Sequence, residues 1–312
     1  MKTVSKHLYR NLSLGILAVV LAALIAAAWL HPLAGGPQSG QRLNVVAGEN
    51  FWGSLASQLG GNRVNVTSIV SDPNADPHEY ESSTANARSF AAANLIILNG
   101  AGYDDWGNKL LAANPEAGRQ VLTAATLLGK KTGDNPHFWY NPDYVYKMVD
   151  QISAEYESID PAHAGYYRSQ HATVEASLNP YRQRLGYIKS HFGGTRVAAT
   201  EDIFAYLASY TGLNLVSPPE FMQAVAEGND PPADSVATFN DQLAAGTPKV
   251  LVYNLQTSTA VTTNIRKLAA AQNIPVVGVT ETTQPPGATF QDWMDGELDA
   301  LTNALNAPAL GQ

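Results

Sequence analysis

Cysteine is absent from the 312-residue chain. Its absence excludes a disulfide framework, a thiolate metal site, a cysteine nucleophile and a lipid-modified cysteine. Any metal ion must therefore be held by His, Asp, Glu or backbone oxygen. Charged residues are also scarce, at 15%, and the net charge is −8. This balance argues against nucleic acid as a partner, because nucleic-acid binding needs a basic surface.

The N-terminus carries the one long uncharged apolar run, residues 12–30, which three basic residues precede (Lys2, Lys6 and Arg10). This pattern indicates an export signal or a membrane anchor. The run is long for a signal peptide and long enough to span a bilayer, which favours an uncleaved anchor over a cleaved signal. Either way, we expect the rest of the chain to be extracytoplasmic and associated with the cell membrane.

Beyond this run, short apolar strands alternate with helices, and 45% of all residues are hydrophobic, which supports a sizeable core. Such alternation predicts parallel βαβ units covered by helices on both faces. A stretch of about thirty residues with helical periodicity and no strand interrupts the pattern. We therefore predict an α/β fold with two lobes, each a mostly parallel sheet with flanking helices. The predicted segments are an N-terminal signal or anchor (1–40), a first lobe (41–157), a long connector helix (158–192) and a second lobe (193–312).

Polar residues that could bind a metal follow four of the predicted strands. His78 and His137 lie in loops of the first lobe, and Glu201 and Glu281 directly follow the apolar strands VAAT and VGVT in the second. Ligands of open α/β sheets bind beyond the carboxyl ends of the strands. Two imidazoles and two carboxylates at such ends predict a site for a divalent metal.

Each of these residues also has a purely structural interpretation. A loop histidine often lies on the surface, and His137, beside Trp139, could simply pack in the core. Glu201 and Glu281 could cap the helices that follow them, because carboxylates favour helix N-termini. We expect Asp202, next to Glu201, to be a cap rather than a ligand.

The loop that carries His78 has an unusual composition, SDPNADPHEYESS, with X-Pro bonds at Pro73 and Pro77. A residue before proline is pushed out of helical geometry, so this loop is expected to be extended and partly fixed. We expect the two prolines to hold His78 toward the cleft before metal arrives.

The segment SDPNADPHEYESSTANARSFAAANLIILNGAGYDDW resembles the TroA-like (cluster A-I) family, the metal receptors of ABC importers for zinc and manganese. NPHFWYNP, around His137, is similar to the second histidine motif of that family, D-P-H-x-W-x-D-P. The resemblance covers about Leu43 to Ala307 and implies two α/β lobes with the metal between them. It implies His78 and His137 as ligands from the first lobe, Glu201 as the third ligand and Glu281 as the fourth, where the family more often has Asp.

Three features depart from the family pattern. Asn135 and Asn141 stand where the family has aspartates around His137. Neutral amides replace carboxylates there, so the electrostatic surroundings of this histidine depart from the family pattern. The preceding segment, LLGKKTGD, is short and basic, whereas zinc receptors commonly carry a His-rich or acidic loop there. No lipid-attachment cysteine is present, so the apolar run must anchor the chain or be cleaved.

The resemblance implies a binding protein and not an enzyme. Its ligand would be Zn²⁺ or Mn²⁺, with Fe²⁺ as a further candidate, and its partner a membrane ABC permease. We expect a monomer. One alternative is a zinc-dependent hydrolase, but catalytic zinc needs an open position for water, and four protein ligands would fill a tetrahedral site. The other is a surface adhesin in which the metal is structural.

The apolar run generates a first prediction. Full-length protein should sediment with membranes, because about twenty apolar residues span the hydrocarbon core of a bilayer. Fractionation followed by mass spectrometry of the intact chain checks this. A soluble mature chain that begins between Trp29 and Ser39 would contradict the anchor and leave export intact.

Overall fold

The computed structural model describes residues 42–74, 77 and 80–308. The contacts divide the chain into two units, Met1–Gly40 and Gln41–Gln312, and the structure below is that of the second unit. The predicted signal or anchor at 12–30 and the predicted ligand His78 both lie outside the described residues. Within the described part, no helix is long and apolar enough to cross a membrane.

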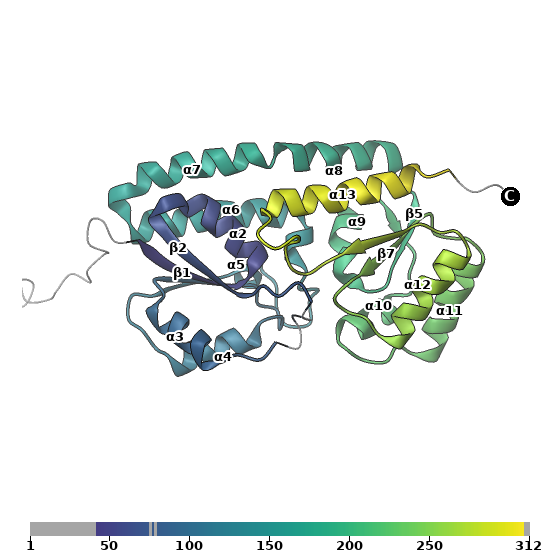
Figure 1. The fold of residues 1–312 in the computed structure, drawn as a ribbon, viewed down its shortest axis with the longest axis horizontal. Coiled ribbons are helices and arrows are strands. Elements are labelled where there is room, and N and C mark those ends of the chain that lie inside the picture. The colour runs from purple at the N-terminus through teal and green to yellow at the C-terminus, as the bar shows by residue number, and fades with distance from the viewer. Residues whose placement is uncertain (1–41, 75–76, 78–79, 309–312) are drawn as a thin grey trace, which may run out of the picture. The chain divides into compact units, whose positions relative to one another are not determined.

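The first lobe is built on a sheet of four parallel strands in the order β2-β1-β3-β4 (Figure 1). Its strands are β1 (Leu43–Glu49), β2 (Val64–Val70), β3 (Leu95–Leu98) and β4 (Gln120–Thr123). Its helices are α2 (Asn50–Gly60), α3 (Thr84–Ala92), α4 (Asp105–Ala113), α5 (Ala124–Leu127) and α6 (Pro142–Ile159).

Successive residues of these strands enter different apolar clusters. In β1, Val45 and Ala47 pack in the cluster that contains residues of α2 and α6, whereas Val46 packs with Phe90 of α3 and Trp106 of α4. This follows from the two-residue period of a strand, which sends neighbouring side chains to opposite faces. The sheet is therefore covered on both faces, as continuous apolar strands predict.

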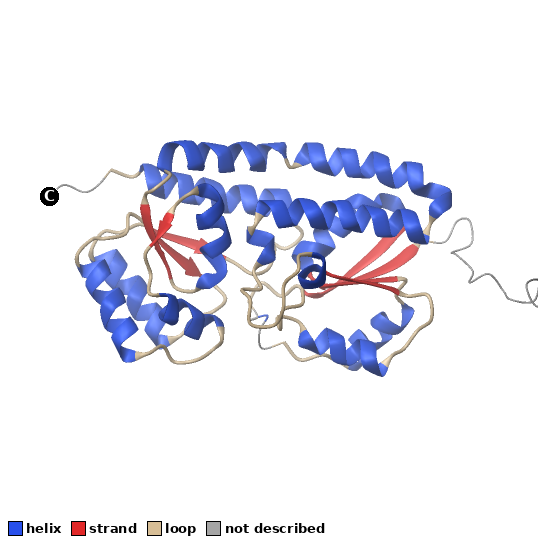
Figure 2. Cartoon of the chain, turned by 180° about the vertical axis from the view of Figure 1, so that it is seen from behind, coloured by secondary structure: helices blue, strands red, loops and turns tan. Residues whose placement is uncertain are grey.

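The second lobe repeats the design with the parallel order β6-β5-β7-β8. Figure 2 shows the strands of each lobe in red with helices in blue around them. Its strands are β5 (Arg196–Ala199), β6 (Asn214–Leu215), β7 (Leu251–Asn254) and β8 (Val276–Val279). Its helices are α9 (Ala205–Thr211), α10 (Pro219–Ala226), α11 (Ala233–Ala244), α12 (Ala260–Ala271) and α13 (Phe290–Asn306). The predicted fold class, two lobes with parallel sheets and flanking helices, is confirmed.

Two helices lie end to end between the lobes, α7 (Ala164–Ser177) and α8 (Asn179–Phe192), and they run along one side of both (Figure 1). They meet at Leu178, and Pro180 occupies the first turn of α8. Proline is tolerated in a first turn but not in the interior of a helix, which explains why the connector is broken here. The helix α7 packs on α2 and α6 of the first lobe, and α8 packs on α9 and α13 of the second.

One apolar cluster runs through both lobes and the connector. Phe51 of α2 stacks on Trp139 with ring centroids 4.1 Å apart, and Trp293 of α13 lies 6.5 Å from Phe51. Phe290, also of α13, meets Tyr181 of α8 at 6.1 Å. Each aromatic side chain buries some 150–250 Å², so wide opening of the lobes would expose much apolar surface. This shared core holds the facing strand ends of the two sheets together.

Candidate metal centre

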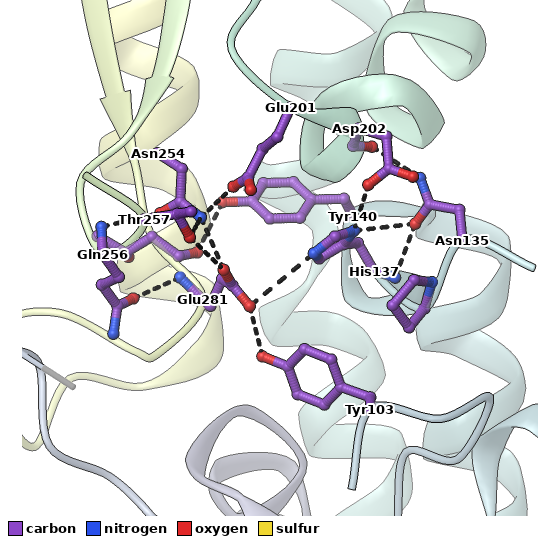
Figure 3. A network of polar contacts seen from close by, with 12 residues as sticks. Tyr103, Asn135, His137, Tyr140, Glu201, Asp202, Asn254, Gln256, Thr257 and Glu281 are labelled. Carbon is purple, nitrogen blue, oxygen red and sulfur yellow. Dashed lines mark hydrogen bonds and ion pairs between the residues drawn. The ribbon is translucent and has the colours of Figure 1, made fainter. Parts of the chain in front are cut away.

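Two glutamates converge at the carboxyl edge of the second sheet (Figure 3). Glu201 follows β5, Glu281 follows β8, and both side chains are fully buried. Asn254, the last residue of β7, donates from Nδ2 to Glu281 Oε1 at 2.7 Å and also hydrogen-bonds Glu201 Oε1. Because β7 lies between β5 and β8 in the sheet, the strand order itself places Asn254 between the two carboxylates.

Further hydrogen bonds join Glu281 to residues of both lobes. Tyr103, in the loop after β3, donates its hydroxyl to Glu281 Oε2 at 2.7 Å. The Glu281 backbone N–H donates to Gln256 Oε1 at 2.6 Å, which fixes the main chain at this point. His137 Nε2 lies 3.9 Å from Glu281 Oε2. A predicted ligand from the first lobe and one from the second therefore face each other.

His137 is fully buried, and its ring is oriented through its other nitrogen. Nδ1 lies 2.9 Å from Asn135 Oδ1 and 3.2 Å from Asp202 Oδ1 (Figure 3). Asn135 Oδ1 also accepts the His137 backbone N–H at 2.9 Å, which identifies it as the oxygen of the amide. Asn135 Oδ1 accepts the hydrogen bond from Nδ1, so Nδ1 carries the hydrogen. In the neutral ring, Nε2 then has the free electron pair that a metal requires.

The two loops of the first lobe are held by a second buried network. Asp104 accepts from the backbone N–H groups of Asn99 and Gly100 at 2.6 and 2.7 Å. Asn99 in turn donates from Nδ2 to the carbonyl of Pro136 at 2.9 Å and accepts from Trp52 Nε1 at 3.1 Å. The Tyr103 loop and the His137 loop are thus joined behind the site. This keeps both side chains aimed at Glu281.

Glu49, the last residue of β1, is buried with 1% of its surface exposed and interacts electrostatically with Asp104. Burial raises the pKa of the Glu49 carboxyl well above its usual range, and the charge of Asp104 raises this pKa further. Burial also raises the pKa of Asp104, although the two backbone N–H groups that bond it act in the opposite direction. Two adjacent carboxyls in an apolar setting cannot both ionise cheaply, and the pKa of Glu49 is raised more than that of Asp104, because Asp104 accepts from two backbone N–H groups.

Three of the four predicted ligands, His137, Glu201 and Glu281, come together, and the fourth, His78, lies outside the described residues. In the part of the chain that the structure describes, no group of three or more His, Asp or Glu side chains is spaced to hold a metal. The Asn254 amide bridges the two glutamates instead. The donor set nevertheless fits a divalent transition metal, since it combines an imidazole nitrogen with two carboxylates.

The capping interpretation of the glutamates gains no support. Glu201 precedes a short 3-10 turn (Asp202–Phe204), but its side chain makes no capping hydrogen bond. Glu281 is far from the start of α13, which Thr289 caps by accepting from the Asp292 backbone N–H. The prediction that Asp202 is a cap is wrong: its side chain makes no cap and instead reaches His137.

Residues of the site that sequence reasoning missed include Asn254 and Tyr103. Asn254 ends the apolar strand LVYN, and the two glutamates likewise follow apolar strands. The rule that ligands bind beyond the carboxyl ends of strands would have found Asn254 if amides had been considered. Glu49 ends β1 in the same way. Tyr103 had no such signal, because nothing in its loop sequence indicates that it reaches the other lobe.

Comparison with known proteins places the chain in a family. The family model described as zinc-uptake complex component A, periplasmic, matches residues 45–304. The manganese-binding lipoprotein MntA of Bacillus subtilis is 25% identical over 214 residues, 64% of this chain and 68% of that protein. The iron-binding protein YfeA of Yersinia pestis is 27% identical over 186 residues, 56% of this chain and 59% of that protein.

A solved structure shows the same fold. The SBP FpvC from Pseudomonas aeruginosa in complex with Mn²⁺ superposes with a TM-score of 0.69 at 20% identity, covering 85% of this chain and 98% of that one. The curated relatives named above are matched over only 59–68% of their own length.

Fold and site together define a metal-binding receptor of the kind that serves ABC transporters, which is not an enzyme. The chain belongs to the family of the periplasmic component A of zinc-uptake complexes, because that model matches most of its length. The resemblance stated from the sequence is confirmed, and the hydrolase alternative is excluded.

Glu49 generates a prediction about pH. Its pKa is raised by folding, so the folded protein holds this proton more tightly than the unfolded chain. The free energy of unfolding should therefore fall as the pH rises from about 4.3 toward the raised pKa, by up to about 1.4 kcal/mol per pH unit. Glu49→Gln removes this loss, so the metal-free variant should lose less stability than the wild type between about pH 5 and pH 8.

Urea unfolding of both proteins across this range measures the difference. Glu220→Gln makes the same chemical change at an exposed position of α10 and should follow the wild type. An identical pH slope in Glu49→Gln and the wild type would show that Glu49 ionises normally in the folded state.

Proposed function

We propose that this chain captures Zn²⁺ or Mn²⁺, with Fe²⁺ as a further candidate, outside the cytoplasmic membrane and delivers the ion to the permease of an ABC transporter. The ligands are His78, His137, Glu201 and Glu281. The observation that carries the proposal is the convergence of two fully buried glutamates on one point, with His137 Nε2 facing Glu281.

Charge balance explains why this point suits a divalent cation. Isolated buried carboxylates are costly, because each loses its hydration. Asn254 and Tyr103 offset part of this cost by donating to the glutamates. A divalent ion between Glu201 and Glu281 would cancel both charges and take the place of the Asn254 bridge. The same donors would hold the two glutamates after the cargo has been released.

The fourth proposed ligand, His78, follows β2 in the sequence and lies outside the described residues. The described part of that loop is tied to the segment that follows Glu281, because Gln284 Nε2 donates to the carbonyl of Pro73 at 3.1 Å. Thr283, in the same segment, donates its backbone N–H to Asn50 Oδ1, at the start of α2, at 3.0 Å. These two bonds join the second lobe to the first.

The choice of ion depends on how Glu281 binds. If Tyr103 keeps its bond to Oε2, Glu281 offers one oxygen, and the site has the four-coordinate geometry that zinc favours. If the metal displaces Tyr103, both oxygens become available, and the coordination number rises toward that of manganese. The segment before His137 is short and basic and lacks the His-rich or acidic loop common in zinc receptors, which weakens the case for zinc alone.

Glu281→Gln tests the site. The amide keeps the size of the side chain and removes its charge, so binding of Zn²⁺ and Mn²⁺ should weaken by about tenfold or more, which corresponds to about 1.4 kcal/mol. Calorimetric titration of both ions into metal-free protein measures this. Glu220→Gln, at an exposed position in the same lobe, should bind as the wild type does. Unchanged affinity for both ions in Glu281→Gln removes this residue from the ligand set.

The same samples separate a receptor from an adhesin with a structural metal. A receptor gives up its ion to a chelator and keeps its circular dichroism spectrum, whereas a protein with a structural ion unfolds. Loss of secondary structure on addition of chelator at 25 °C would favour the adhesin.

A further inference from the structure

Among the residues that the structure describes, the carboxylate nearest to His137 comes from the opposite lobe. Asp202 Oδ1 lies 3.2 Å from His137 Nδ1, while the neighbour from the histidine's own loop is the neutral amide of Asn135, at 2.9 Å. Asp202 directly follows Glu201 at the end of β5. Glu201 therefore points toward the proposed metal centre, and the next residue, Asp202, points toward Nδ1 of His137 in the first lobe (Figure 3).

Other bonds hold this arrangement in place. Asn135 Nδ2 donates to the backbone carbonyl of Asp202 at 2.7 Å, and Tyr206 donates its hydroxyl to the carbonyl of Asn135 at 2.9 Å. The side-chain oxygen of Asn135 therefore bonds His137, and its side-chain nitrogen bonds the backbone of the second lobe. This pattern fixes both the orientation of the amide and the distance between the two segments.

Asp202 also occupies an electrostatically suitable position. Its side chain is 24% exposed, whereas that of His137 is fully buried. It lines a cavity of about 850 Å³ between the two lobes, together with Tyr103, Asp134 and Asn135. A carboxylate that keeps contact with solvent retains part of its hydration, so its charge costs less than that of a fully buried group.

We propose that Asp202 is a positioning residue for the metal site: its carboxylate shares the Nδ1 hydrogen of His137 with Asn135 and couples this ligand to closure of the lobes. A carboxylate on Nδ1–H orients the ring and raises the basicity of Nε2, and loss of such a partner typically weakens metal affinity by about 10- to 100-fold. Because Asp202 belongs to the second lobe, His137 has its full strength as a ligand only while the lobes are together. Coupling between the lobes and the metal is reciprocal, so bound metal also favours the closed arrangement.

A charge swap tests this proposal. Asp202→Asn should weaken Zn²⁺ and Mn²⁺ binding by about tenfold or more. The double variant Asn135→Asp with Asp202→Asn moves the carboxylate to the histidine's own loop and should regain most of that affinity, because Nδ1 again faces one carboxylate and one amide. Asp134→Asn is the matched control: it removes the same charge from the same cavity, and Asp134 bonds the backbone N–H of Lys131. Its affinity should stay close to that of the wild type.

A measurement on metal-free protein keeps this test separate from the proposed function, on which the inference rests. Nitrogen-15 NMR of labelled histidine should show His137 with its hydrogen on Nδ1, and Asp202→Asn should shift the Nδ1–H proton resonance whereas Asp134→Asn should not. Failure of the wild type to bind any metal would refute the proposed function and leave this measurement valid.

The role of Asp202 is overturned by any of four results. One is a hydrogen on Nε2 of His137 in the wild type. The second is wild-type affinity in Asp202→Asn, and the third is an equal loss in Asp134→Asn. The fourth is a double variant that melts at the wild-type temperature and yet regains no affinity.

Discussion

The structure depends on one electrostatic constraint: two glutamates, Glu201 and Glu281, have lost their water and must share a small volume. Carboxylates in that situation need donors or a cation, because unpaired buried charge is strongly destabilising. Asn254 bridges them, and Tyr103 reaches across from the other lobe to one of them. A divalent ion neutralises the two carboxylates better than neutral donors do, and we infer that this difference is the origin of metal binding.

The fold supplies this constraint through topology and a shared core. Parallel strands bring their carboxyl ends to one edge, and the order β5-β7-β8 puts Asn254 between the glutamates. The aromatic cluster around Phe51 and Trp293 joins the two lobes, so donors from the first lobe stay within reach of the second. The network around Asp104 holds the loops of the first lobe. Rigidity here serves to pre-organise the ligands, which limits the cost of binding.

Much of the fold and part of the candidate site could be predicted from the sequence, because local sequence patterns determine them. Eight apolar strands that alternate with helices were expected and are present, and the strand-end rule located His137, Glu201 and Glu281. The rest depends on contacts between segments that are distant in the chain. That Asp202 reaches His137 rather than capping a helix, and that Tyr103 reaches Glu281, depends on how the lobes meet, which no local pattern encodes. The missing negative charge near His137, left open by Asn135, is likewise supplied from the other lobe.

The central claim is that one divalent ion binds where the Asn254 amide now bridges the glutamates. Anomalous diffraction from crystals grown with Zn²⁺ or Mn²⁺, collected at the absorption edge of that ion, tests this claim most directly. The account predicts one strong peak at about 2.0–2.2 Å from His137 Nε2 and from an oxygen of each glutamate, with His137 Nδ1 still on Asp202 and Asn135. A peak on Nδ1, or one remote from Glu201 and Glu281 while Asn254 still bridges them, would contradict it.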